Sequence, residues 1–277
     1  MGKTFSREEI LARIAETMNQ GKPVIGAGCS AGIIAKSAEL GGADLIIVYS
    51  TGKSRLMGLP TSYIGHSNPI TLEMFEEIQN VVKETPVIAG IEAADPTTWD
   101  LERLLKRFIG HGYDGIINFP TMGIYGKERR ELRESVGTGF SREIQMVQIA
   151  HRMDIFTIVY AFNPEDAKAL TEAGADVVCA HAGGTAGGLI GFRSAPLEIA
   201  VDRVQRIIEA VREIRPDVIC LAHGGPFSEP QNTTYLYEHT DAQGFVGASS
   251  IERIPVEKAV IECVKSFKSI TLKRGKR

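Results

Sequence analysis

The sequence has few cysteines, and their spacing suits neither disulfides nor a thiolate metal site. Cys29, Cys179, Cys220 and Cys263 are scattered over 277 residues without a CxxC pair. This argues against a disulfide scaffold and favours buried thiols, which pack as small hydrophobes, over redox, metal or nucleophilic roles. Cys29, beside a glycine at a predicted strand end, is the exception and a candidate to contact a ligand.

Long apolar runs and an excess of one charge are also lacking. No run approaches the length of a membrane span, and the polar start MGKTFSREEI is no signal segment, so we expect a cytoplasmic protein. Lysine and arginine number 31 against 34 acidic residues, a net charge of −3, which predicts no binding to nucleic acid or membrane surfaces. Residues 271–277 are expected to form a solvated basic tail.

What the chain does have is regular alternation between short apolar runs and helix-period segments. The predicted strands begin at Pro23, Leu45, Pro86, Gly115, Phe156, Val177, Val218 and Gly244. Nearly continuous apolar strands indicate a parallel sheet buried on both faces, and eight of them predict a closed (β/α)8 barrel. A doubly wound open sheet is the alternative. We expect a single domain over residues 1–277, with a leading helix at 5–20 whose capping box is Ser6 and Glu9.

Two connections are long, from Thr51 to Pro69 and from Thr121 to Phe140. Each follows the C-terminal end of a predicted strand, where the loops of a barrel carry function. They are therefore candidates for lids over the site, for partner contacts or for a subunit interface. Together with the leading helix they add apolar surface, from which we predict a homo-oligomer.

One stretch of sequence occurs twice, as DVVCAHAGG from Asp176 and DVICLAHGG from Asp217. Counted from the aspartate, His181 is the fifth residue on and His223 the sixth. Because strand side chains alternate between faces, we expect the two histidines not to be equivalent, one pointing into the barrel mouth and the other off it.

Glycine and serine at strand ends predict an anion site, because the loops after the last strands of a barrel commonly bind phosphate through backbone N–H groups. The candidate anion-binding residues are Gly28, Cys29, Ser30, Gly183, Gly184, Gly224, Gly225, Gly247, Ser249 and Ser250. Tight βα turns alone also demand glycine. STGKSR from Ser50 fails as a phosphate loop because Ile47 stands where a glycine is needed, but Lys53 and Arg55 are candidates to meet an anion.

Side chains that titrate or orient a substrate also stand at strand ends. The candidate catalytic residues are Glu92, Asn118, Tyr160, His181 and His223. A glutamate that ends an apolar strand is costly to bury without a partner, which favours a role for Glu92. Asp95 and Asn163, each before a proline, are most simply helix N-caps. No cofactor is evident; a divalent metal such as Mg²⁺ at Glu92, Asp95 and one histidine is an option that no motif marks.

Several motifs resemble those of a known family. PVIGAGCSAG from Pro23, HAGGTAGG from His181, LAHGGP from Leu221 and above all GASSIERIP from Gly247 resemble the TIM-barrel enzymes called phosphoenolpyruvate hydrolase-like. The same module is similar to the C-terminal barrel of two-domain proteins that resemble a plant antiviral inhibitor, whose other domain binds ATP. The DADxGYG-like and KKCGH-like runs of the phosphoenolpyruvate mutase and isocitrate lyase group are missing, so their metal site and cysteine are not implied.

From these features we expect an enzyme that binds a small anionic metabolite, phosphorylated or a 2-oxo carboxylate, and cleaves it by hydrolysis or a lyase-type reaction. Glycines and Ser249 or Ser250 would hold the anion, and Glu92 with His181 or His223 would move protons. The alternative is a non-catalytic barrel that binds a metabolite and works with a separate ATP-binding partner protein.

Overall fold

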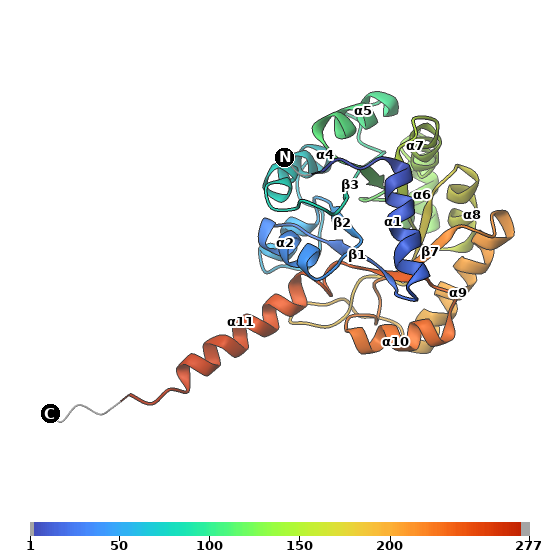
Figure 1. The fold of residues 1–277 in the computed structure, drawn as a ribbon. Coiled ribbons are helices and arrows are strands. Elements are labelled where there is room, and N and C mark those ends of the chain that lie inside the picture. Colours follow the sequence, from blue (N-terminus) through green and yellow to red (C-terminus); the bar gives the residue numbers. More distant parts are fainter. Residues whose placement is uncertain (1–2, 273–277) are drawn as a thin grey trace.

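A computed structural model describes residues 3–272, and its centre is a closed barrel of eight parallel strands (Figure 1). The strands are β1 (Val24–Gly28), β2 (Leu45–Val48), β3 (Val87–Gly90), β4 (Gly115–Ile117), β5 (Phe156–Ala161), β6 (Val177–His181), β7 (Ile219–His223) and β8 (Gly244–Gly247). They pair in sequential order, and β1 closes onto β8. The predicted (β/α)8 barrel is confirmed, and the open sheet is wrong.

Helices surround the barrel and cross its ends. They are α1 (Arg7–Asn19), α2 (Gly32–Leu40), α3 (Gly52–Leu56), α4 (Ser67–Gln79), α5 (Leu101–His111), the 3₁₀ turn η1 (Met122–Ile124), α6 (Lys127–Glu134), α7 (Ser141–Arg152), α8 (Pro164–Glu172), α9 (Leu197–Ile214), α10 (Pro230–His239) and α11 (Arg253–Lys268). No helix within residues 3–272 combines the length and the apolar character that crossing a membrane requires.

Each even-numbered strand is preceded by a polar side chain that accepts the backbone N–H of a residue near the start of the previous strand. The four contacts are Ile25 to Asp44 (2.7 Å), Val87 to Asp114 (2.9 Å), Thr157 to Asp176 (3.0 Å) and Cys220 to Gln243 (2.9 Å). We call these four acceptors the strand brackets. They satisfy N–H groups at the N-terminal end of the barrel, where the ladder leaves them free.

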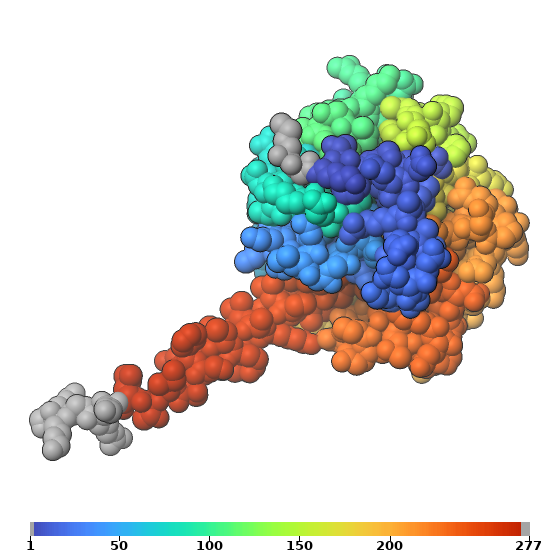
Figure 2. All heavy atoms as spheres, in the orientation of Figure 1, coloured from blue at the N-terminus to red at the C-terminus, as the bar shows by residue number. Residues whose placement is uncertain are grey.

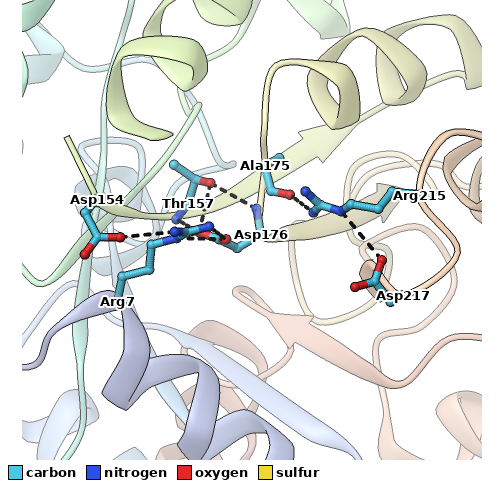
Figure 3. Close-up of polar contacts among 7 residues, drawn as sticks. All are labelled: Arg7, Asp154, Thr157, Ala175, Asp176, Arg215 and Asp217. Atoms are coloured by element: carbon cyan, nitrogen blue, oxygen red, sulfur yellow. Dashed lines mark hydrogen bonds and ion pairs between the residues drawn. The ribbon is translucent and has the colours of Figure 1, made fainter. Parts of the chain in front are cut away.

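The leading helix α1 closes this end of the barrel and lies in front of it in Figure 1. Its capping box is present as predicted, and Ile10 and Ile14 are fully buried against the barrel interior. The helix is tied to the strand brackets: Arg7 donates to Asp176 at 2.7 Å (Figure 3). Thr17 donates to Asp44 at 2.5 Å. All four brackets therefore contact the N-terminal segment as well as the strands, since Asp114 accepts the Phe5 N–H and the Gln243 amide donates to the Met18 sulfur at 3.4 Å.

The strand register corrects one expectation about the repeated stretches. His181 and His223 are direct partners across β6 and β7, so their positions are equivalent and the predicted difference in phase is wrong. The aspartates are what differ: Asp176 is a buried bracket before an even strand, whereas the Asp217 side chain is 88% exposed beside Arg215 (Figure 3). Counting from the aspartates misplaced the histidines because only one aspartate belongs to the strand-bracket pattern.

The two predicted N-caps have different outcomes. Asn163 caps α8, with Pro164 in the first turn, as expected. Asp95 does not cap a helix, because α5 begins six residues later with Asp100 as its N-cap. Its carboxylate accepts instead from Thr97 and contacts His66, which fixes the turn after β3.

The last helix, α11, leaves the barrel and extends away from it (Figure 2). Its exposed side chains include an apolar stripe at helical spacing, formed by Val256, Val260, Val264 and Phe267. Of the four cysteines, Cys263 on this helix is exposed and the other three are buried free thiols, as predicted for apolar runs. The basic tail at 273–277 lies outside the described residues.

Candidate functional site

A cavity of about 410 Å³ lies at the C-terminal ends of the strands, and we call it the mouth cavity. It is lined by Tyr49, Thr51, Arg55, Thr61, Ser62, Tyr63, Phe119, Ile124, Phe162, His181, Gly183, Gly184, Thr185, Phe192, Arg203, His223, Ala248 and Ser249. Both long loops contribute to it. Two arginines and two histidines face this space, and no aspartate or glutamate from residues 3–272 lines it, so the cavity favours an anion.

The two histidines lie side by side beneath the cavity. Their ring centroids are 4.5 Å apart, and each residue is 6% exposed. Burial lowers the pKa of His223 to about 4, and burial together with the neighbouring His223 lowers the pKa of His181 well below its ordinary value. Both rings are therefore neutral at neutral pH and can donate or accept single protons.

Tyr160 packs against both rings, with centroids 5.0 Å from His181 and 4.9 Å from His223. Its hydroxyl is fully buried and lies near that of Tyr49, which lines the cavity. The structure places Tyr160 next to the histidines but beneath the residues that line the cavity.

Asn118 acts on Tyr160 and lies outside the cavity lining. Its amide accepts from the Tyr160 N–H at 2.7 Å and donates to the Tyr160 carbonyl, so it fixes the end of β5. It also donates to Glu143, a fully buried carboxylate that accepts from Thr121 and the Met122 N–H. Burial raises the pKa of Glu143 to about 7. Sequence reasoning missed Glu143 because it lies inside a helix.

A buried ion pair stands at the other side of the cavity. The Arg55 Nε–H donates to Glu252 at 2.8 Å, and Glu252 also accepts from the backbone and hydroxyl of Ser30. No other acceptor within residues 3–272 binds the remaining N–H groups of Arg55, which lines the cavity. The pairing joins positions 197 residues apart, although each lies within a motif that the sequence shows, GKSR and GASSIER.

The two glycine pairs have different places. Gly183 and Gly184 line the cavity, whereas Gly224 and Gly225 pack behind them. Gly224 has a φ of +75°, and a Cβ there would lie 2.1 Å from the Gly183 oxygen, which Gly225 binds through its N–H at 2.8 Å. The second pair therefore supports the loop that carries the first and is not part of the cavity lining.

At the ends of β1 and β8, too, some predicted residues line the cavity and others lie behind its lining. Ser249 lines the cavity, and neither its N–H nor that of Ser250 donates to an acceptor within residues 3–272. Gly28 packs against Ala248, and Gly247 packs against Ile251 and Ser250, so neither glycine is part of the cavity lining. The thiol of Cys29 donates to the Ala27 carbonyl, and burial raises its pKa, so it is no ready nucleophile.

Glu92 and Asp95 do not reach the cavity lining. Glu92 is half-buried, and its backbone is held by Asn68, while the Asp95 carboxylate is taken by three neighbouring side chains, Asn68 among them. Within residues 3–272, no three His, Cys, Asp or Glu side chains are grouped to hold a metal. Mg²⁺ prefers oxygen ligands such as carboxylates, and the cavity offers none, so the residues present do not fit it.

These features define a closed (β/α)8 barrel with a positively charged cavity at the C-terminal ends of its strands. The chain belongs to the phosphoenolpyruvate hydrolase-like family, whose model matches residues 9–270. It is 42% identical over 275 residues to the ToMV resistance protein Tm-1(GCR237) of Solanum lycopersicum, an alignment that covers 96% of this chain and 36% of that protein. The chain thus spans about a third of the length of the curated relatives it matches.

Solved structures with the same fold include enzymes. Oxaloacetate acetylhydrolase in complex with oxalate matches with a TM-score of 0.62 at 17% identity, covering 99% of this chain and 92% of that one. Phosphonopyruvate hydrolase in complex with oxalate and Mg²⁺ matches with a TM-score of 0.59 at 18% identity, covering 95% and 87%. At these identities the likeness shows the fold.

Proposed function

We propose that this protein is an enzyme that binds a small anionic substrate, a phosphorylated or 2-oxo carboxylate compound, in the mouth cavity and cleaves it by hydrolysis or a lyase-type reaction. The observation that carries the proposal is the cavity itself, which combines Arg55 and Arg203 with two neutral histidines and no carboxylate. Family membership and the enzymes that share the fold support it.

The proposed roles follow from where each group lies. Arg203 attracts the anion through its charge. The remaining N–H groups of Arg55, together with Ser249 and the Gly183–Gly184 backbone, donate hydrogen bonds to it, because unpaired donors at strand ends suit anionic oxygens. His181 and His223 move protons, and Asn118 holds Tyr160 against them. Glu92 is assigned no proton transfer here, because it lies outside the cavity lining. No step of this scheme uses a metal.

Binding by Arg203 can be tested without knowing the reaction. Phosphoenolpyruvate and oxaloacetate are titrated calorimetrically against the wild type and the Arg203→Gln variant, with Arg206→Gln as the matched control. Both arginines are exposed on α9, but Arg206 pairs with Asp202 away from the cavity. We expect Arg203→Gln to weaken binding roughly tenfold, the effect of about 1.4 kcal/mol. If Arg203→Gln binds these anions as tightly as Arg206→Gln and the wild type do, the anion site is contradicted.

Self-association is a second part of the proposal. The apolar stripe on α11, together with Ile270 and Leu272 beyond it, is exposed in the single chain. Such a continuous apolar face is costly in water, and we propose that a second copy of the chain covers it in a homo-oligomer. A cytoplasmic location and an ATP-binding partner protein stay predictions from the sequence.

A further inference from the structure

The two histidines of the mouth cavity are equivalent in strand register but not in hydrogen bonding. The Nδ1 atom of His181 lies 3.0 Å from the backbone N of Gly183. The Nδ1 atom of His223 lies 2.6 Å from the carbonyl oxygen of Val246 on β8. One ring therefore meets a backbone donor where the other meets a backbone acceptor.

These partners fix where each ring carries its proton. A backbone N–H can only donate, so Nδ1 of His181 must accept, and the proton of the neutral ring sits on Nε2. A carbonyl can only accept, so Nδ1 of His223 must carry the proton, which leaves a lone pair on its Nε2. Because burial keeps both rings neutral, His181 presents a donor at Nε2 and His223 presents an acceptor.

The sequence difference after the two strands explains the asymmetry. Ala182 separates His181 from its glycine pair, so the N–H of Gly183 can turn back to the ring. His223 is followed directly by Gly224, whose left-handed backbone packs against the Gly183 oxygen. No backbone N–H of that loop within residues 3–272 reaches the His223 ring, which bonds across to β8 instead.

We propose that His181 and His223 form a fixed donor–acceptor pair of opposite neutral tautomers, which selects a carboxylate ligand that carries a hydroxyl on the neighbouring carbon or holds a water there. His223 Nε2 accepts the O–H of that group, and His181 Nε2–H donates to the adjacent carboxylate or carbonyl oxygen. The proposal rests on the proposed function and extends its ligand class: a 2-oxo carboxylate meets the pair through a held water, and a 2-hydroxy carboxylate meets it directly.

The tautomers are tested directly on the full chain labelled with ¹⁵N-histidine. Two-bond ¹⁵N–¹H correlation spectra distinguish Nδ1–H from Nε2–H rings, and the His181→Gln and His223→Gln variants assign the signals, with exposed His239→Asn as the control. We expect Nε2–H for His181 and Nδ1–H for His223, both persisting at about one pH unit below the ordinary histidine value. Should a variant not fold, the wild-type spectrum still decides: two persistently neutral rings of the same tautomer would overturn the pair.

Ligand selection is tested with glycolate and acetate, which differ only in the hydroxyl. We expect glycolate to bind about tenfold more tightly to the wild type, the effect of one added hydrogen bond, and the difference to disappear in His223→Gln. Equal binding of the two anions would overturn the selection while leaving the anion site intact. Binding of neither glycolate nor phosphoenolpyruvate would instead count against the proposed function, and the labelled spectra would still report on the tautomers.

Discussion

Buried ionisable side chains around the mouth cavity differ in how they are compensated. Arg55 and Glu252 neutralise each other, whereas Glu143 has only neutral donors around it. Its carboxylate is fully buried, and desolvation raises its pKa from 4.5 to about 7. The folded protein therefore binds this proton more tightly than the unfolded chain does, so Glu143 stabilises the fold below the ordinary glutamate pKa and loses that contribution as pH rises through about 7.

This gives a prediction for Glu143→Gln, which cannot titrate. Relative to the variant, the wild type should lose roughly 2 to 3 kcal/mol of unfolding free energy between about pH 5 and pH 8. Denaturant unfolding of both proteins at the two pH values measures the change, and comparing the pair cancels the other titrating groups. A constant difference would show that Glu143 keeps an ordinary pKa in the fold.

Only some of the individual residues at the mouth cavity could be predicted from the sequence. His181, His223 and Ser249 were predictable because polar groups at the ends of apolar strands of a barrel meet at one mouth. Arg55 was only a candidate, and its pairing with Glu252 was not predictable, because it depends on how distant loops fold over the barrel. Glu92 was misplaced because it lies beyond the end of β3, where its backbone is held by Asn68.

At the scale of the strands and helices, the two aspartates of the repeated stretch test the strand brackets, because only Asp176 is a bracket and Asp217 serves as its control. Asp176 accepts from Arg7 and from the backbone and hydroxyl of Thr157, whereas Asp217 is exposed. We expect Asp176→Ala to destabilise the fold by about 3 kcal/mol, because it leaves the buried Thr157 N–H unpaired and removes the more buried of the two carboxylates that bind Arg7, and Asp217→Ala by less than about 0.5 kcal/mol. Similar losses in the two variants, measured by denaturant unfolding, would refute the bracket role.

All eight strands were predictable at this scale because each is a local apolar run, and a closed parallel barrel needs nothing but their number and order. The register between β6 and β7 was not. Counting from Asp217 placed His223 one residue out of register with His181. The strand brackets, which are contacts between strands, show that Asp217 does not belong to the pattern that includes Asp176.

At the scale of the whole molecule, the apolar stripe of α11 is the basis of the proposed self-association. Val260 and Val264 are 56% and 55% exposed on a helix that extends from the barrel. We expect light scattering to report a multiple of the 30.1 kDa chain, and the double variant Val260→Asp, Val264→Asp to shift it to the single chain. Substituting Lys265 and Lys268 with Gln on the same helix shifts the net charge by the same two units and is the control for charge. A wild type that remains a single chain at all concentrations would remove the oligomer.

The proposed function depends on chemistry taking place in the mouth cavity. The most direct measurement is NMR-monitored turnover of phosphorylated and 2-oxo carboxylates by the full chain, in Mg²⁺ and in chelator, beside His223→Gln. We predict that at least one compound is cleaved, that chelator leaves the rate unchanged because the cavity lacks carboxylate ligands, and that the variant still folds but loses turnover. Thermal stabilisation by these anions without cleavage of any would contradict the enzyme and favour a metabolite-binding barrel that serves a partner protein.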